Sequence, residues 1–195
     1  SLLNKPSVGY CGSRDASEKG KEVVRKTTEL FSENDIVTVS GNARGIDLEV
    51  HLSTLKYGGD TILVLPQGIC DFKPRKELRE FWSSERTLVL SEFPLESRWH
   101  VSKAMKRNET IIGLSNAMLV IEAKDGGGSM NAGLKTLFYN KPLYAPLYEG
   151  MPEFASGNRL LLKKGAKSFG RDKTTLQPNL TSILVDVRSN PGSLF

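Results

Sequence analysis

The stretch IVTVSGNARGID at residues 36–47 decides the fold of this chain. Its first four residues are apolar or β-branched and predict a short buried strand. Gly41 and Gly45 allow a tight turn, and the apolar segment that follows is typical of a helix. The stretch therefore predicts a strand, a glycine-rich turn and a helix in direct succession, which is the repeating unit of an α/β protein.

The same succession recurs through the first 150 residues. Further apolar runs with β-branched residues predict strands at residues 8–11, 61–65, 87–90, 117–121 and 142–145. Longer amphipathic stretches separate these runs; one follows Ser17, and another ends before Gly58 and Gly59. Strand–helix alternation predicts a mainly parallel sheet flanked by helices on both faces.

We expect one domain over residues 1–188 and a frayed tail over residues 189–195. The strand–helix pattern weakens after residue 150, where residues 151–180 are rich in Lys, Gly and Ser. Residues 183–187 are predicted to form one last strand. The sequence shows no internal repeat and no low-complexity segment.

The net charge is +5 and the isoelectric point is about 9.2. Basic residues gather at residues 98–107, with four Lys and Arg and no acid, and at residues 158–173, with six against Asp172 alone. Such clusters can neutralise the phosphates of a nucleic acid. A solvated basic face is the alternative that charge alone leaves open.

Several classes of protein are excluded by composition. The longest strongly apolar run has about five residues, whereas a membrane helix needs roughly 20. No signal peptide is visible, so we expect a cytoplasmic protein with no membrane partner. Cys11 and Cys70 lie far apart and predict reduced thiols. We expect neither a bound metal nor a cofactor.

Small, polar or charged residues follow each of the first five predicted strands. They are Gly12-Ser13-Arg14, residues 40–47, Pro66-Gln67-Gly68, residues 91–94, and Glu122 with residues 126–129. Ligands of an open parallel sheet bind outside the carboxyl ends of its strands. The sequence therefore predicts a binding site along that edge.

The chemistry of these residues favours an anion. Glycines let the backbone approach a ligand, and helix N-termini present free N–H groups and a positive dipole end. Hydroxyl donors and cations come from Ser13, Ser40, Ser129, Arg14 and Arg44. For residues 40–47 we favour phosphate binding over a simple turn, because a turn needs neither the serine nor the arginine. For residues 126–129, a flexible loop with Ser129 as a helix cap explains the sequence nearly as well.

Evidence for catalysis is weak. The sequence has no GxGxxG, GxxxxGK[ST], GxSxG or HExxH motif, and His51 and His100 are interpreted as structural. Asp47, Glu92 and Glu122 follow strands and could act in acid–base chemistry, but such carboxylates more often cap helices or brace loops. We expect a protein that is not an enzyme.

The motifs, taken in order, resemble the DNA-processing protein A (DprA/Smf) family. They are GSR at 12–14, SGNARGID at 40–47, GGDTILVL at 58–65, SEFP at 91–94, RN at 107–108, IIGLS at 111–115, IEA at 121–123, GS at 128–129, GN at 157–158 and GA at 165–166. The resemblance implies an extended Rossmann-like fold, a homodimer, binding of single-stranded DNA and loading of a RecA-type recombinase. It also implies a role in natural transformation or recombination.

The resemblance assigns DNA phosphate binding to residues that match the family motifs by position. They are Gly12, Ser13, Arg14, Ser40, Gly41, Ala43, Arg44, Gly45, Lys106, Arg107, Asn108, Gly128 and Ser129. The chain departs from the family where FPxRNR is usual, because residues 104–109 read AMKRNE. The aromatic residue is missing there, and Trp99 either replaces it as a base-stacking group or serves in packing. The N-terminal helical and C-terminal winged-helix-like domains of longer relatives have no counterpart, so we expect weaker DNA affinity.

The alternative is a nucleotide-binding sensor or a nucleoside-monophosphate hydrolase of the related phosphoribohydrolase type. Those enzymes carry a PGGxGTxxE loop with a catalytic glutamate. Residues 126–133 are the nearest match here, and they lack both the proline and the downstream glutamate.

Overall fold

A seven-stranded parallel sheet organises the structure, which is a computed structural model describing residues 1–148, 150, 152–172 and 177–189. The sheet order is β4-β3-β2-β1-β5-β6-β7, and all neighbouring strands pair in parallel. The strands are β1 (Ser7–Cys11), β2 (Val37–Ser40), β3 (Thr61–Val64), β4 (Thr87–Leu90), β5 (Ala117–Val120), β6 (Leu143–Pro146) and β7 (Lys167–Phe169). From the central β1 the chain moves outward to β4, and then returns to the other side of β1 with β5.

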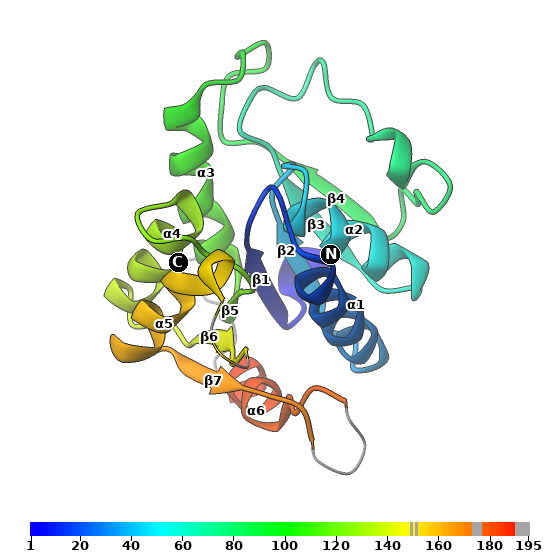
Figure 1. Cartoon of the computed structure of the whole chain (residues 1–195). Coiled ribbons are helices and arrows are strands. Elements are labelled where there is room, and N and C mark those ends of the chain that lie inside the picture. Colours follow the sequence, from blue (N-terminus) through cyan, green and yellow to red (C-terminus); the bar gives the residue numbers. More distant parts are fainter. Residues whose placement is uncertain (149, 151, 173–176, 190–195) are drawn as a thin grey trace.

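Helices cover both faces of the sheet (Figure 1). They are α1 (Glu18–Glu33), α2 (Ile46–Lys56), α3 (Val101–Leu114), α4 (Gly128–Phe138), α5 (Ser156–Lys163) and α6 (Thr181–Ser189), with short 3-10 turns at Leu2–Asn4, Lys76–Leu78 and Glu153–Ala155. One core layer joins α1, α2 and α6 to the sheet, and a second joins α3, α4 and α5 to its other face. The predicted parallel α/β fold with helices on both faces is confirmed.

Alternating side chains of the central strands fill the two core layers. In β5, Ala117 and Leu119 pack toward α1 and α6, whereas Met118 and Val120 pack toward α3 and α4. Both faces are therefore buried, which explains why the strands appear in the sequence as continuous apolar runs.

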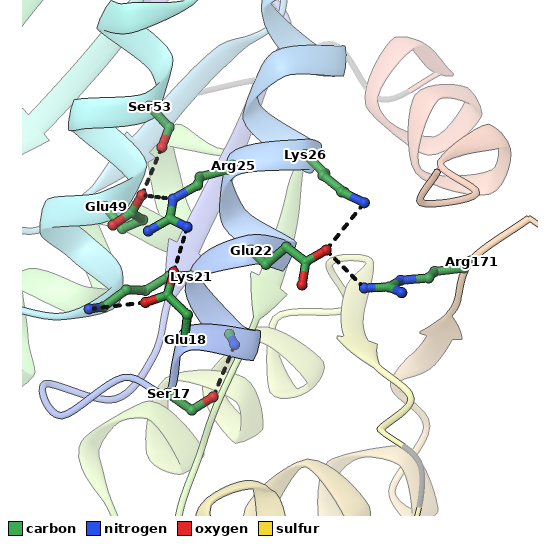
Figure 2. Close-up of polar contacts among 10 residues, drawn as sticks. Ser17, Glu18, Lys21, Glu22, Arg25, Lys26, Glu49, Ser53 and Arg171 are labelled. Carbon is green, nitrogen blue, oxygen red and sulfur yellow. Dashed lines mark hydrogen bonds and ion pairs between the residues drawn. The ribbon is translucent and has the colours of Figure 1, made fainter. Parts of the chain in front are cut away.

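The helices α1 and α2 are joined by charged contacts (Figure 2). Arg25 on α1 donates from Nε to Glu49 Oε1 at 2.7 Å and from Nη1 to Glu18 Oε1 at 2.6 Å. Ser17, which precedes the predicted helix, caps α1 by accepting a hydrogen bond from Gly20 N at 3.0 Å. These contacts fix the starts of both helices beside the carboxyl ends of β1 and β2.

The predicted strand at residues 183–187 is wrong, because this segment lies in α6. Ile183 and Val187 are buried in the same core layer, whereas Val185 between them is 57% exposed. Apolar residues four positions apart with an exposed residue between them have helical spacing. The last strand is instead β7, whose exposed Lys167 and Ser168 conceal it from an apolar pattern. The predicted tail begins at Ser189, the end of α6; residues 190–195 lie outside the described residues.

None of the described helices has both the length and the apolarity that crossing a membrane requires. The described residues also contain no group of three or more His, Cys, Asp or Glu side chains arranged to hold a metal ion.

A buried asparagine links α5 to the sheet. The side chain of Asn158 accepts a hydrogen bond from Ala123 N at 2.9 Å and donates to the carbonyls of Ile121 at 2.9 Å and Val120 at 3.2 Å. Gly157 lies so close that a Cβ there would be 2.8 Å from the Ala123 carbonyl oxygen. The GN pair at 157–158 is therefore explained by packing against the end of β5.

Replacing Asn158 with alanine is expected to lower the free energy of unfolding by about 3 kcal/mol, because it leaves buried backbone groups without partners. Urea unfolding followed by circular dichroism measures the change. Ser156→Ala is a matched control in the same helical turn, where the Ser156 hydroxyl accepts a long 3.4 Å bond from Asp125 N and no other hydrogen bond from the described part of the chain. Equal effects of the two substitutions would contradict the assigned role of Asn158.

His51 connects α2 to the sheet, in agreement with its interpretation as structural. Its Nε2 lies 2.7 Å from the Gly41 carbonyl and must donate to it, so Nδ1 accepts from the Thr61 hydroxyl at 2.7 Å. Burial lowers the pKa of His51 to about 4, against the opposing effects of the Gly41 hydrogen bond and of Asp47. The folded protein therefore keeps this imidazole neutral at pH values where an unfolded chain protonates it.

Acidification is expected to destabilise the fold through His51. Between about pH 6.5 and pH 4 the unfolded state binds a proton that the folded state does not, so stability falls as the pH falls, by up to roughly 3 kcal/mol. Urea unfolding at a series of pH values measures this dependence. His51→Gln is the control, since an amide does not titrate; an unchanged pH dependence in that variant would show that His51 is not responsible.

Candidate nucleic-acid interface

A small pocket lies at the carboxyl ends of β1 and β5. This is the switch point of the sheet, because the chain leaves β1 toward β2 on one side while β5 lies on the other. The pocket has a volume of about 80 Å³. Six predicted site residues line it: Gly12, Arg14, Arg107, Asn108, Gly128 and Ser129. Residues from three separate motifs thus meet at one place.

A larger pocket of about 350 Å³ adjoins the first. Four predicted residues line it, namely Arg14, Ala43, Arg44 and Arg107, together with Asn42, Gln67, Arg75, Trp99 and others. Arg14 and Arg107 line both pockets. Four arginines from four different segments therefore surround one continuous region at the carboxyl edge of the sheet.

Arg107 is the buried member of this group, with only 5% of its surface exposed. Its Nη1 donates to the Val64 carbonyl at 3.1 Å and lies 3.6 Å from Asp47 Oδ2, while its Nε is buried without a hydrogen-bond partner. A Cβ at Gly41 would lie 1.3 Å from Arg107 Nη1. Gly41 is therefore required for packing against this guanidinium, and not only for approach of a ligand.

The N-termini of α2 and α4, two of the helices that begin at this edge, differ in charge. The helix α4 begins after Gly127, no described side chain caps it, and its first turn carries no acid. Ser129 lies inside this turn and donates to the Gly12 carbonyl at 2.8 Å, so it is not the helix cap. By contrast, α2 carries Asp47 and Glu49 in its first turn. The N-terminus of α4 therefore offers a positive end to an anion, whereas that of α2 does not.

Five predicted residues line neither pocket. Ser40, expected to donate to phosphate, is fully buried and donates to the Tyr10 carbonyl at 3.1 Å. Ser13 Oγ accepts from Asp15 N at 3.1 Å, and Lys106 lies 3.5 Å from a Glu92 carboxylate oxygen. Gly41 and Gly45 shape the backbone: Gly45 has φ = 77°, and a Cβ there would lie 2.3 Å from the Ser13 carbonyl oxygen.

The basic segment at 158–173 lies elsewhere, and none of its described residues lines either pocket. Lys167 donates to Asp186 Oδ2 at 2.6 Å, and Arg171 donates to Glu22 Oε1 at 3.1 Å (Figure 2). In Figure 1, α5 and β7 lie far from the connection between β4 and α3. Lys173 lies outside the described residues. A solvated basic face describes this segment better than a part of the site.

Arg75 and Gln67 line the larger pocket, and neither was among the predicted phosphate-binding residues. Arg75 donates from Nη2 to the Asn42 carbonyl at 2.8 Å and from Nε to Asn42 Oδ1 at 3.3 Å, which orients it over the 40–47 loop. Gln67 lies two residues after a predicted strand, and the sequence analysis placed it with Pro66 and Gly68 on the binding edge without assigning it a role. Arg75 lies ten residues beyond that strand, so only the tertiary structure identifies it.

The carboxylates at the strand ends have structural partners. Glu122 is fully buried and accepts hydrogen bonds from Ser17 N at 3.0 Å and from the Ser17 hydroxyl. Glu92 accepts from Thr110 Oγ1 at 2.7 Å. Cys11 lines the small pocket, and burial raises the pKa of its thiol to about 12, which disfavours the reactive thiolate. These contacts agree with the interpretation of the carboxylates as braces.

Comparison with known sequences places these residues in one family. The family model of DNA recombination-mediator protein A matches residues 1–178. DNA processing protein DprA of Streptococcus pneumoniae is 34% identical over 85% of this chain and 59% of its own length. DprA of Bacillus subtilis is 31% identical over 86% of this chain and 57% of its own length. Protein Smf of Escherichia coli is 33% identical over 84% of this chain and 44% of its own length. The chain thus spans less than two thirds of the length of these relatives.

Solved structures share the fold. DprA from Streptococcus pneumoniae superposes with a TM-score of 0.76 at 31% identity, covering 86% of this chain and 59% of the other. DprA from Helicobacter pylori gives a TM-score of 0.77 at 24% identity, covering 96% and 81%. A molybdenum cofactor carrier protein from Chlamydomonas reinhardtii matches at a TM-score of 0.60 and 14% identity, covering 95% of this chain and 99% of the other. This likeness extends to the fold alone. From the motifs, the geometry and the family match together, the chain belongs to the DNA recombination-mediator protein A family.

Proposed function

We propose that this chain holds single-stranded DNA by its phosphates at the carboxyl edge of the sheet. The observation that carries the proposal is the meeting of Arg14, Arg44, Arg75 and Arg107 at two adjoining pockets, beside the uncapped N-terminus of α4. Guanidinium groups and free backbone N–H groups are the donors that position a nucleic-acid backbone. The role is that of a DprA/Smf-type protein in DNA processing, recombination or natural transformation.

The size of the site favours a single strand over a duplex. The larger pocket has a volume of about 350 Å³, within the range of roughly 300–1,000 Å³ typical of small-molecule sites. A pocket of this size matches individual nucleotides of a flexible strand. The structural study of DprA from Helicobacter pylori concerns the single-stranded DNA binding mode of that relative, which supports the same ligand class here.

The family resemblance extends the proposal to partners. We propose a homodimer as the working state, a RecA-type recombinase as the protein to which the DNA is passed, and the cytoplasm as the location.

The hydrolase alternative is less well supported, because the candidate glutamate Glu122 is fully buried and accepts hydrogen bonds from Ser17.

Arg44→Ala tests the phosphate site. The Arg44 side chain is 70% exposed and pairs with Asp15 at 3.2 Å, so its removal takes away charge without opening the core. We expect weaker binding of labelled oligo-dT in fluorescence anisotropy. The slope of log affinity against log salt should become shallower by roughly 0.7, because the variant neutralises one phosphate fewer.

The matched control is Arg86→Ala, because Arg86 is an exposed arginine that precedes β4 at the opposite, amino edge of the sheet and pairs with Asp60 at 3.8 Å. Arg86→Ala is expected to leave the slope unchanged. A change of slope equal to that of Arg44→Ala, or a weakening that depends on the base sequence of the oligonucleotide, would contradict a phosphate site at Arg44.

Arg107→Met is expected to affect stability as well as binding. It leaves the buried Asp47 carboxylate without its cation, which should lower the free energy of unfolding by about 3 kcal/mol in urea titrations. The double variant Arg107→Met with Asp47→Asn should recover part of that stability, since no unpaired charge remains. Independent, additive effects of the two substitutions would show that the pair is not coupled in the folded protein.

A further inference from the structure

We propose that the larger pocket also binds a base, with Trp99 as the platform on which one base of the strand stacks. The inference rests on the proposed function, and it adds that the strand is held by a base as well as by its phosphates. Aromatic side chains beside a positively charged groove are the usual means by which proteins hold single strands without reading their sequence.

Trp99 is half-exposed at the larger pocket, unlike the other tryptophan of the chain. Trp99 lines the larger pocket and is 52% exposed, whereas Trp82 lies in a core cluster with its ring 5.9 Å from that of Phe72. Leu95 and Val101, on either side of Trp99 in the chain, are 66% and 56% exposed. Val101 lines the adjoining small pocket, so an exposed apolar side chain borders each of the two pockets. Since Trp99 is half-exposed and belongs to none of the core clusters of the described residues, its ring is accessible to a ligand.

The backbone around Trp99 is held in place before any ligand binds. Gly68 N donates to the Ser97 carbonyl at 2.7 Å, and Cys70 N donates to the Leu95 carbonyl at 3.1 Å. A Cβ at Gly68 would lie 2.0 Å from the Leu95 carbonyl oxygen, so this close approach depends on a glycine. On the other side, His100 caps α3 by accepting from Ser102 N at 3.2 Å. A platform fixed at both ends loses little conformational entropy when a base stacks on it.

The surroundings of the ring supply the other half of a nucleotide site. Arg14, Arg44 and Arg75 line the same pocket, and the small side chain of Ala104 limits crowding beside them. Cations for the phosphates and a π-face for the base therefore border one space of about 350 Å³. Because every base has a π-face, we expect binding that tolerates any sequence.

The test compares a normal oligonucleotide with one that has phosphates but no bases. Anisotropy titrations use labelled oligo-dT and an abasic strand of the same length, with the wild type, Trp99→Ala and Trp99→Tyr. Phe138→Ala is the matched control, since Phe138 is an aromatic residue that is 80% exposed at the far end of α4 and lines neither pocket. In a Trp82→Phe background, the emission of Trp99 alone reports stacking.

We expect the wild type to prefer oligo-dT over the abasic strand by roughly tenfold, and Trp99→Ala to bind the two strands equally well. Trp99→Tyr should restore most of the preference, Phe138→Ala should keep all of it, and oligo-dT should quench the emission of Trp99. An undiminished preference in Trp99→Ala, or unquenched emission at saturating oligo-dT, would overturn the base site while leaving phosphate binding intact. A wild type that binds neither strand at low salt would overturn the proposed function and this inference together.

Discussion

Arg107 reaches from α3 across the carboxyl edge of the sheet, where its guanidinium bonds to the Val64 carbonyl at 3.1 Å and lies 3.6 Å from Asp47 Oδ2. It thereby joins the end of β3 to the start of α2 and rests on Gly41 at the end of β2. A buried guanidinium needs such partners, because an ionised group in the interior is stable only when it is paired and hydrogen-bonded. Both pockets are bordered by this one side chain, so their geometry depends on it.

This arrangement divides the cations of the site by role. Arg107 is partly neutralised by Asp47 and mainly sets the shape of the pockets, whereas Arg14, Arg44 and Arg75 are closer to solvent and better placed to meet phosphates. The helix N-termini are divided in the same way. Asp47 occupies the start of α2, and the start of α4 has no acid in its first turn. At the start of α4 the positive end of the helix dipole is therefore not offset by an acid of its own first turn.

The fold alone does not select the ligand. A molybdenum cofactor carrier protein shares it at a TM-score of 0.60, although its identity to this chain is only 14%. This chain carries four arginines and one exposed tryptophan at the larger pocket on the carboxyl edge of its sheet. A function has to be argued from such a site and not from the architecture that carries it.

The sequence by itself determined the parallel α/β fold, most of the strand positions and the edge of the sheet at which the motif residues gather. Continuous apolar runs and glycine-rich turns are local signals, and in a parallel sheet they place all strand ends on one side. It did not separate residues that line the pockets from residues that support them. Ser40 and Gly41 share a motif with Arg44, yet Ser40 bonds to Tyr10 inside the sheet and Gly41 makes room for Arg107.

Only the tertiary structure decided the remaining features. It placed Arg75 over the 40–47 loop, exposed Trp99 at the pocket, and turned residues 183–187 into a helix whose Ile183 and Val187 pack on the sheet. The physical reason is the same in each case. Burial, charge pairing and helix packing depend on contacts between residues far apart in the chain, and no local pattern of residue types encodes those contacts.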